Sequence, residues 1–284
     1  MDDNSIIISP QGAKGRASWQ ALLEVAPLLG EDWILIGGQM VTVYATGHLD
    51  AISRETTDAD IVVNLRVDTK SLEKTHQILV NAGFTQLVST RVGTGHRYCR
   101  GEATIDVLVP EGIGYRNLLR LGMGTTVAAR GASRALIRSR RVTIQLDGTV
   151  GMIRIPSPVG ALVIKGSAFY YNQSGLQGSP KRHHDDIITL LQCCHFSKSE
   201  LPLSKSEKKI FQKIMEDKNI PSLLRSRLSP LMQETLQLAN TQQVPPNTII
   251  PIASKSKRCT YRLSNNRQCK NRTTNPSGKC HHHS

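Results

Sequence analysis

ILIGGQMVTVYATGHLDAISRETTDADIVVNL, residues 34–65, opens on an apolar run, breaks at Gly37–Gly38 and ends on Asp58 and Asp60. The apolar run is typical of a buried strand, the glycine pair predicts a turn, and residues 39–48 predict a short helix. The residues around the aspartates predict the next strand. An ionised carboxylate in such an apolar stretch is costly unless it is paired or binds an ion. The two aspartates are therefore the first candidates for a functional site.

A third carboxylate, Asp106, lies inside ATIDVLVP, residues 103–110, whose alternation predicts another strand. Side chains repeat every two residues along a strand, so Asp58 and Asp60 share one face. If the two strands are neighbours, the three carboxylates converge on one site. Hard oxygen ligands of this kind suit Mg²⁺, which also binds substrate phosphates. Ions held in this way activate an attacking hydroxyl and stabilise a departing pyrophosphate.

The glycine pair adds a second part to this site. Gly37 and Gly38 follow a strand and open a helix, so their backbone N–H groups can approach a phosphate without a Cβ in the way. A glycine turn alone is a weak signal, and a D-x-D motif alone is more often a solvated strand end. Both together, followed by an aspartate on a later strand, form a much more specific pattern.

The chain as a whole predicts an α+β fold, a mixed sheet with flanking helices. Asp147–Gly148 between two apolar segments is a strong hairpin signal. Further predicted elements are helices over 17–30, 68–83, 157–173 and 181–194, a bent hairpin over 83–101, hairpin strands over 141–146 and 149–155, and short helices over 206–218 and 221–239. The predicted organisation is a first domain over 1–195, a helical segment over 196–240, a Pro-rich linker over 241–256 and a small Cys/His tail over 257–284.

The net charge is +14, and the positive charge is concentrated in two intervals without acidic residues. Eight Lys or Arg residues follow Glu234, and seven arginines lie between Tyr115 and Leu146. Such surfaces attract phosphate backbones through counterion release, which favours a nucleic-acid partner over a merely charged, solvated surface. The chain has no run of 18 apolar residues and no secretory signal, so we expect a cytoplasmic protein without a membrane partner.

The tail predicts a structural Zn²⁺ site. Cys259, Cys269, Cys280 and His283 have the spacing C-x9-C-x10-C-x2-H, and four such ligands are what a closed tetrahedral site requires. His281 or His282 are alternatives to His283. Because this polar segment is too short to form an apolar core, metal binding would be its main route to folding. The alternative is a disordered basic tail with unpaired thiols.

The tail is also similar to a small zinc-finger-like segment found on assorted bacterial proteins. The similarity rests on the cysteines and His283 together with Asn271, Gly278, Arg267, Lys270 and Arg272. It implies a structural zinc ion that presents basic residues to RNA or DNA.

The combination of Gly37, Gly38, Asp58, Asp60 and Asp106 resembles the nucleotidyltransferase superfamily. That superfamily combines a glycine turn, a pair of acidic residues two apart and a later strand carboxylate. The resemblance implies that the first two aspartates hold the metals and the nucleotide. It implies that the third helps to deprotonate the acceptor hydroxyl.

More closely, residues 33–195 look like the AbiEii-type toxin branch of that superfamily. Lys165 in ALVIKGSAF matches a lysine on a helix after the core sheet, and would neutralise triphosphate charge. Asp186 in KRHHDDIITLL matches an aspartate on the next helix, with Asp185 as the competing choice. Arg54 lies where related proteins often carry a basic residue before the acidic pair.

The resemblance implies an Mg²⁺-dependent enzyme that transfers NMP from an NTP to a hydroxyl acceptor. Relatives of this type suggest tRNA ends as the acceptor, growth arrest or phage defence as the consequence, and an acidic antitoxin protein as a partner. Two alternatives remain open. One is a small-molecule adenylyltransferase of the antibiotic-modifying kind, which a strongly basic chain disfavours. The other is a non-catalytic nucleic-acid-binding protein on a transferase scaffold.

Overall fold

The computed structural model describes residues 5–48, 51, 55–65, 68, 70–87, 96–113, 127–171, 180–241, 257–258 and 272–273. The chain divides into two compact units, Met1–Leu238 and Ala239–Ser284. In the second unit, β10 (Lys257–Arg258) and β11 (Arg272–Thr273) form an antiparallel pair. The proposed zinc ligands and one proposed nucleotide-binding residue lie outside the described residues: Cys259, Cys269, Cys280, His283 and Arg54.

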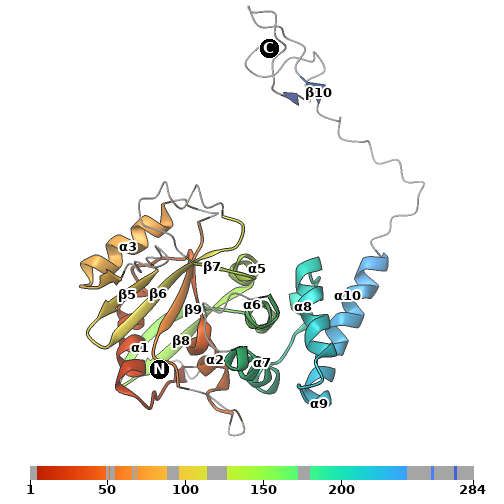
Figure 1. Cartoon of the computed structure of the whole chain (residues 1–284), viewed down its shortest axis with the longest axis horizontal. Coiled ribbons are helices and arrows are strands. Elements are labelled where there is room, and N and C mark those ends of the chain that lie inside the picture. Colours follow the sequence, from red (N-terminus) through yellow and green to blue (C-terminus); the bar gives the residue numbers. More distant parts are fainter. Residues whose placement is uncertain are drawn as a thin grey trace, which may run out of the picture. The chain divides into compact units, whose positions relative to one another are not determined.

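The first unit is an α+β domain built on two sheets (Figure 1). The larger sheet has the strand order β2-β3-β6-β5-β4, and β7 pairs with β6 off this path. Its strands are β2 (Trp33–Ile36), β3 (Ala59–Val63), β4 (Thr85–Leu87), β5 (Arg97–Arg100), β6 (Ala103–Pro110) and β7 (Ala128–Ala129). β3 and β6 are parallel neighbours, so the two predicted strands that carry aspartates do lie side by side.

The smaller sheet has the order β1-β8-β9. Its strands are β1 (Ile6–Ile7), β8 (Ser139–Leu146) and β9 (Thr149–Pro156). The predicted hairpin is confirmed, because β8 and β9 pair antiparallel around Asp147–Gly148, which both have positive φ, at 49° and 82°. Two central residues with positive φ are what a tight hairpin turn of this length requires.

Ten helical segments surround these sheets within the described residues. They are α1 (Ala13–Val25), α2 (Gly37–Ala45), α3 (Ser71–Asn81), α5 (Ala132–Ile137), α6 (Pro158–Tyr171), α7 (Pro180–Cys193), the 3₁₀ turn η1 (Lys198–Glu200), α8 (Lys205–Glu216), α9 (Ser222–Ser226) and α10 (Ser229–Thr241). The first helix ends earlier than the predicted 17–30, because Pro27 cannot continue an intrahelical hydrogen-bond ladder. α5 was not predicted. No helix of the described ranges is long and apolar enough to cross a membrane.

The two faces of the larger sheet have different coverings. One face, with Ile61 of β3 and Ile105 of β6, belongs to the main core, which also takes in side chains of α1, α2, α6 and α7. The other face carries a smaller apolar cluster, made by Ile34, Ile36, Val62, Leu108, Ala129, Ala132, Ala135 and Ile164. α5 and α6 therefore cover that second face. Because side chains alternate along a strand, Asp60 and Asp106 lie on the same face as this smaller cluster.

The helices after residue 195 pack against the α+β part. Ser204 and Glu207 form a reciprocal cap at the start of α8. Glu207 is fully buried and accepts a hydrogen bond of 2.8 Å from Nε of Arg138, which lies between α5 and β8. The same guanidinium donates to the carbonyls of Glu200 and Pro202. This arginine thus holds α8 and the segment before it against the smaller sheet.

Candidate metal centre

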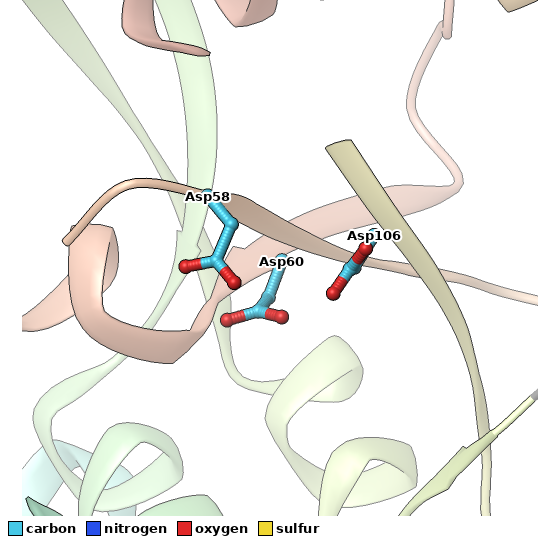
Figure 2. A group of neighbouring side chains, drawn as sticks. All are labelled: Asp58, Asp60 and Asp106. Atoms are coloured by element: carbon cyan, nitrogen blue, oxygen red, sulfur yellow. The ribbon is translucent and has the colours of Figure 1, made fainter. Parts of the chain in front are cut away.

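Three carboxylates converge at the edge of the apolar cluster on β3 and β6 (Figure 2). Asp58 comes directly before β3, Asp60 is its second residue, and Asp106 is the register partner of Asp60 on β6. One oxygen atom from each residue lies within 4.8 Å of the others. The spacing of two residues and the parallel register together produce this arrangement, because both place the side chains on one face of the sheet.

The clustered negative charge is only partly balanced. The pKa of Asp60 is raised to about 7, first by loss of solvent around its carboxylate and then by the charges of Asp58 and Asp106. Lys165 and Arg97 oppose this shift. Since the folded-state pKa lies above that of an unfolded aspartate, ionisation of Asp60 costs stability as the pH rises towards about 7. A divalent cation would remove that cost, and three carboxylate oxygens are suitable ligands for one. The donor set therefore fits a divalent metal ion.

Arg97 on β5 is a site residue that the sequence patterns did not reveal. It is the register partner of Asp106, and its Nε and Nη2 donate to the two Asp106 oxygens at 2.8 and 2.7 Å. Nη2 also lies 3.4 Å from Oδ2 of Asp58. These contacts raise the pKa of Arg97 further, so the guanidinium stays charged. The sequence places Arg97 only within a predicted hairpin. The pairing of β5 with β6 is what brings it opposite Asp106.

Two further polar side chains border the carboxylates. Thr56 donates from Oγ1 to Oδ1 of Asp58 at 3.2 Å. Nε2 of His96 lies 4.0 Å from Oδ2 of Asp106. The Thr56 hydroxyl helps to orient the Asp58 carboxylate. The Asp58 side chain is 34% exposed, whereas that of Asp106 is 7% exposed.

The glycine turn packs directly against the carboxylates. Gly37 has φ +69°, and a Cβ at this position would overlap Oδ2 of Asp60 and lie 2.7 Å from its Cγ. Gly37 and Gly38 form the first turn of α2, which has no side-chain cap and no acidic residue there. The N–H groups of such a turn have no intrahelical partner and form a favourable place for an anion. The glycine turn thus leaves room for the Asp60 carboxylate and places backbone N–H donors beside it.

Lys165 and Asp186 form a buried ion pair between α6 and α7. Nζ of Lys165 lies 2.6 Å from Oδ2 of Asp186, and the two side chains are only 3% and 2% exposed. Asp185, the competing choice, is partly buried, and its backbone carbonyl accepts from Thr189. Lys165 is close enough to Asp60 to lower its pKa. It acts on the carboxylates as a buried, fixed positive charge.

Replacing Arg97 with glutamine is expected to destabilise the metal-free protein and to enlarge the stabilisation by Mn²⁺ or Mg²⁺. The variant leaves the carboxylates without their guanidinium, at a cost of about 1–2 kcal/mol for this half-exposed group, or roughly 3–6 °C in melting temperature. An ion that binds only the folded state then restores more stability than in the wild type. Thermal unfolding with and without each ion measures both effects.

Arg100→Gln is the matched control, because Arg100 lies on the same strand but pairs with Glu24, away from the carboxylates. It should leave the response to the ions unchanged. An Arg97→Gln protein with the wild-type ion response would show that the guanidinium and the ion do not compete for these oxygens.

Comparisons with known proteins give two distant structural similarities. No protein-family model and no curated protein matches the chain. An antigenic nucleotidyltransferase-like protein from Paracoccidioides brasiliensis is similar over 79% of this chain and 95% of its own, with 18% identity and a TM-score of 0.47. The antibiotic-resistance factor ANT(2'')-Ia is similar over 78% of this chain and 95% of its own, with 10% identity and a TM-score of 0.34. Similarities this distant assign no function to the chain.

Proposed function

We propose that the protein is an Mg²⁺-dependent nucleotidyltransferase that transfers NMP from an NTP to a hydroxyl acceptor, with RNA such as tRNA as the acceptor class. The observation that carries this proposal is the convergence of Asp58, Asp60 and Asp106 beside a helix that begins at Gly37–Gly38. The carboxylates offer hard oxygen ligands, and the helix start offers phosphate donors within the same site.

The metal would be held by the three aspartates, and it would supply charge neutralisation for the triphosphate and for the departing pyrophosphate. The free N–H groups at the start of α2 would bind phosphate oxygens. Asp106 would accept the proton of the acceptor hydroxyl. Because Arg97 donates to both oxygens of Asp106, the proton would go to a lone pair that the guanidinium leaves open. Lys165, held in place by its ion pair with Asp186, would present a positive charge to one side of the site.

Charge supports RNA as the acceptor. The chain carries +14, and the acid-free tail after Glu234 holds eight basic residues. A Zn²⁺ ion bound by Cys259, Cys269, Cys280 and His283 would present those residues to a phosphate backbone. Modification of tRNA would arrest growth, so the proposed role is that of a cytoplasmic toxin or defence protein. An acidic antitoxin is the proposed protein partner.

The test is transfer of label from each NTP in turn to total bacterial RNA in the presence of Mg²⁺. The wild type should label RNA, and Asp58→Asn/Asp60→Asn should label it at least about a thousand-fold less, since both ligand charges are lost while the side-chain shapes remain. Asp68→Asn/Asp147→Asn removes two carboxylates outside the cluster and should keep full activity.

Each outcome has a distinct meaning. A labelled band of tRNA size would identify the acceptor, and the active NTP would name the nucleotide. Label in an added aminoglycoside instead of RNA would replace the acceptor class while keeping the transferase. If the folded, metal-supplied protein transfers no label to RNA, protein or small molecules, the proposed activity is wrong.

A further inference from the structure

A second polar site lies away from the carboxylates. A cavity of about 530 Å³ lies between α5, α6 and α8, which are next to one another in Figure 1, at the C-terminal end of β6. Its lining includes three basic side chains, from Arg130, Arg134 and Lys209, and three hydroxyls, from Ser167, Tyr171 and Ser206. The cavity therefore offers hydrogen-bond donors on several sides, from elements far apart in the sequence.

The basic side chains of the cavity have no carboxylate partner among the described residues. Arg130, Arg134 and Lys209 are all exposed, and none of them forms an ion pair within the described parts of the chain. The acidic residue in the lining, Glu111, accepts a hydrogen bond of 3.2 Å from the backbone N–H of Ser133. Most other arginines near the core have carboxylates or carbonyls to bind, as Arg138 does. Three cations against the one carboxylate of Glu111 leave the lining with a net positive charge, which attracts an anionic ligand.

Close helix contacts hold the cavity walls in place. Gly160 of α6 packs against Ala135 of α5, where an added Cβ would lie 3.2 Å from the Ala135 Cα. Gly166 of α6 packs against Ile210 of α8, where an added Cβ would lie 2.5 Å from Cγ2. Such contacts leave little freedom for the helices to move together or apart. The cations are thus carried on a rigid frame, which lowers the entropy cost of binding a ligand.

The cavity is separate from the metal centre. Val163, Ser167 and Tyr171 line it at four-residue spacing on α6, whereas Lys165 lies about 200° around the helix from Val163. Glu111 follows Asp106 by five residues along the β6 direction, or roughly 16 Å of extended chain. That separation corresponds to roughly five stacked nucleotides of a single strand.

We propose that this cavity binds backbone phosphates of the acceptor nucleic acid, several nucleotides away from the hydroxyl that reacts at the carboxylates. Unpaired arginines form bidentate hydrogen bonds to phosphate oxygens, lysine adds a third charge, and the hydroxyls donate further hydrogen bonds. A polymer can place a phosphate in the cavity while its end lies at the carboxylates, whereas an NTP carries all of its phosphates in one triphosphate group. The inference rests on the proposed function in its choice of acceptor, but the binding itself is measurable without catalysis.

The test compares RNA binding by the full chain and by Arg130→Ala/Arg134→Ala/Lys209→Ala, without NTP or metal. Fluorescence anisotropy of a short labelled single-stranded RNA is measured over a series of salt concentrations. Each lost phosphate contact should reduce the salt slope by about 0.7, so the variant should lose about two units of slope. Hydrogen exchange should show that RNA protects residues 132–137 and 205–210 in the wild type but not in this variant.

A matched control removes three exposed cations that do not line the cavity: Lys70, Arg182 and Lys218. Both variants keep the basic tail, so a difference between them reports on the cavity. The control should keep the wild-type slope and the protection of both segments. A cavity variant with the same slope and protection as the control overturns the inference.

The two proposals fail in different ways. If the wild type labels RNA but the cavity variant binds RNA like the control, the phosphate site is wrong and the transferase stands. If cavity binding is confirmed but no label reaches RNA, the proposed activity is wrong and the nucleic-acid site stands.

Discussion

Gly37→Ala is expected to lower nucleotidyl transfer by about 100-fold and to destabilise the protein by about 2–4 kcal/mol. The added Cβ would overlap the Asp60 carboxylate and would force it, or the start of α2, to move. A displacement of about 1 Å in a reacting geometry costs a factor of this size. The positive φ of +69° adds backbone strain for any residue other than glycine. Initial rates and thermal unfolding measure the two effects separately.

Gly30→Ala separates backbone strain from collision with the carboxylate. Gly30 has the same φ of +69°, but nothing lies within 4 Å of the position of an added Cβ. This control should lose only about 1 kcal/mol of stability and should keep the wild-type activity and metal response. If both alanine variants lose activity to the same extent, close packing of Gly37 on Asp60 is not what the site requires.

Lys165→Met is expected to destabilise the protein by about 3–5 kcal/mol, or roughly 10 °C in melting temperature. The substitution leaves the buried carboxylate of Asp186 without the ammonium that lies 2.6 Å from it. An uncompensated charge in the interior costs several kcal/mol. It also removes a positive charge that lowers the pKa of Asp60, so transfer should fall even in the protein that remains folded.

The double variant Lys165→Met/Asp186→Leu distinguishes a structural role from a functional one. Replacing both members of a buried pair with apolar side chains is often neutral for stability, so the melting temperature should return towards the wild-type value. Transfer should stay low, because the fixed positive charge is still missing. Recovery of full activity along with stability would limit the pair to a packing role.

The sequence predicted the carboxylate pattern because its origin is local. Asp58 and Asp60 share a face through the period of a strand, and Gly37–Gly38 marks a turn through its own conformational freedom. The same locality explains the confirmed hairpin at Asp147–Gly148. The sequence pattern did not reveal the second requirement for glycine at residue 37. The Asp60 carboxylate occupies the space that a Cβ would take.

Long-range packing decided the features that the sequence did not reveal. Arg97 faces Asp106 only because β5 and β6 pair in one particular antiparallel register. A shift of one residue would turn it to the opposite face. The choice of Asp186 over Asp185 as the partner of Lys165 likewise depends on how α7 is rotated against α6, which burial of the apolar face of α7 determines.

By itself, the sequence therefore determined an α+β fold, a glycine turn and two aspartates on one face of a strand, because turns and side-chain periods depend on neighbours along the chain. The convergence of Asp106 with these two aspartates depended on the parallel pairing of β3 with β6. The tertiary structure alone decided the guanidinium that balances the carboxylates, the buried Lys165–Asp186 pair and the basic cavity between α5, α6 and α8. These features join residues many positions apart, and their geometry is set by strand register and by close helix packing.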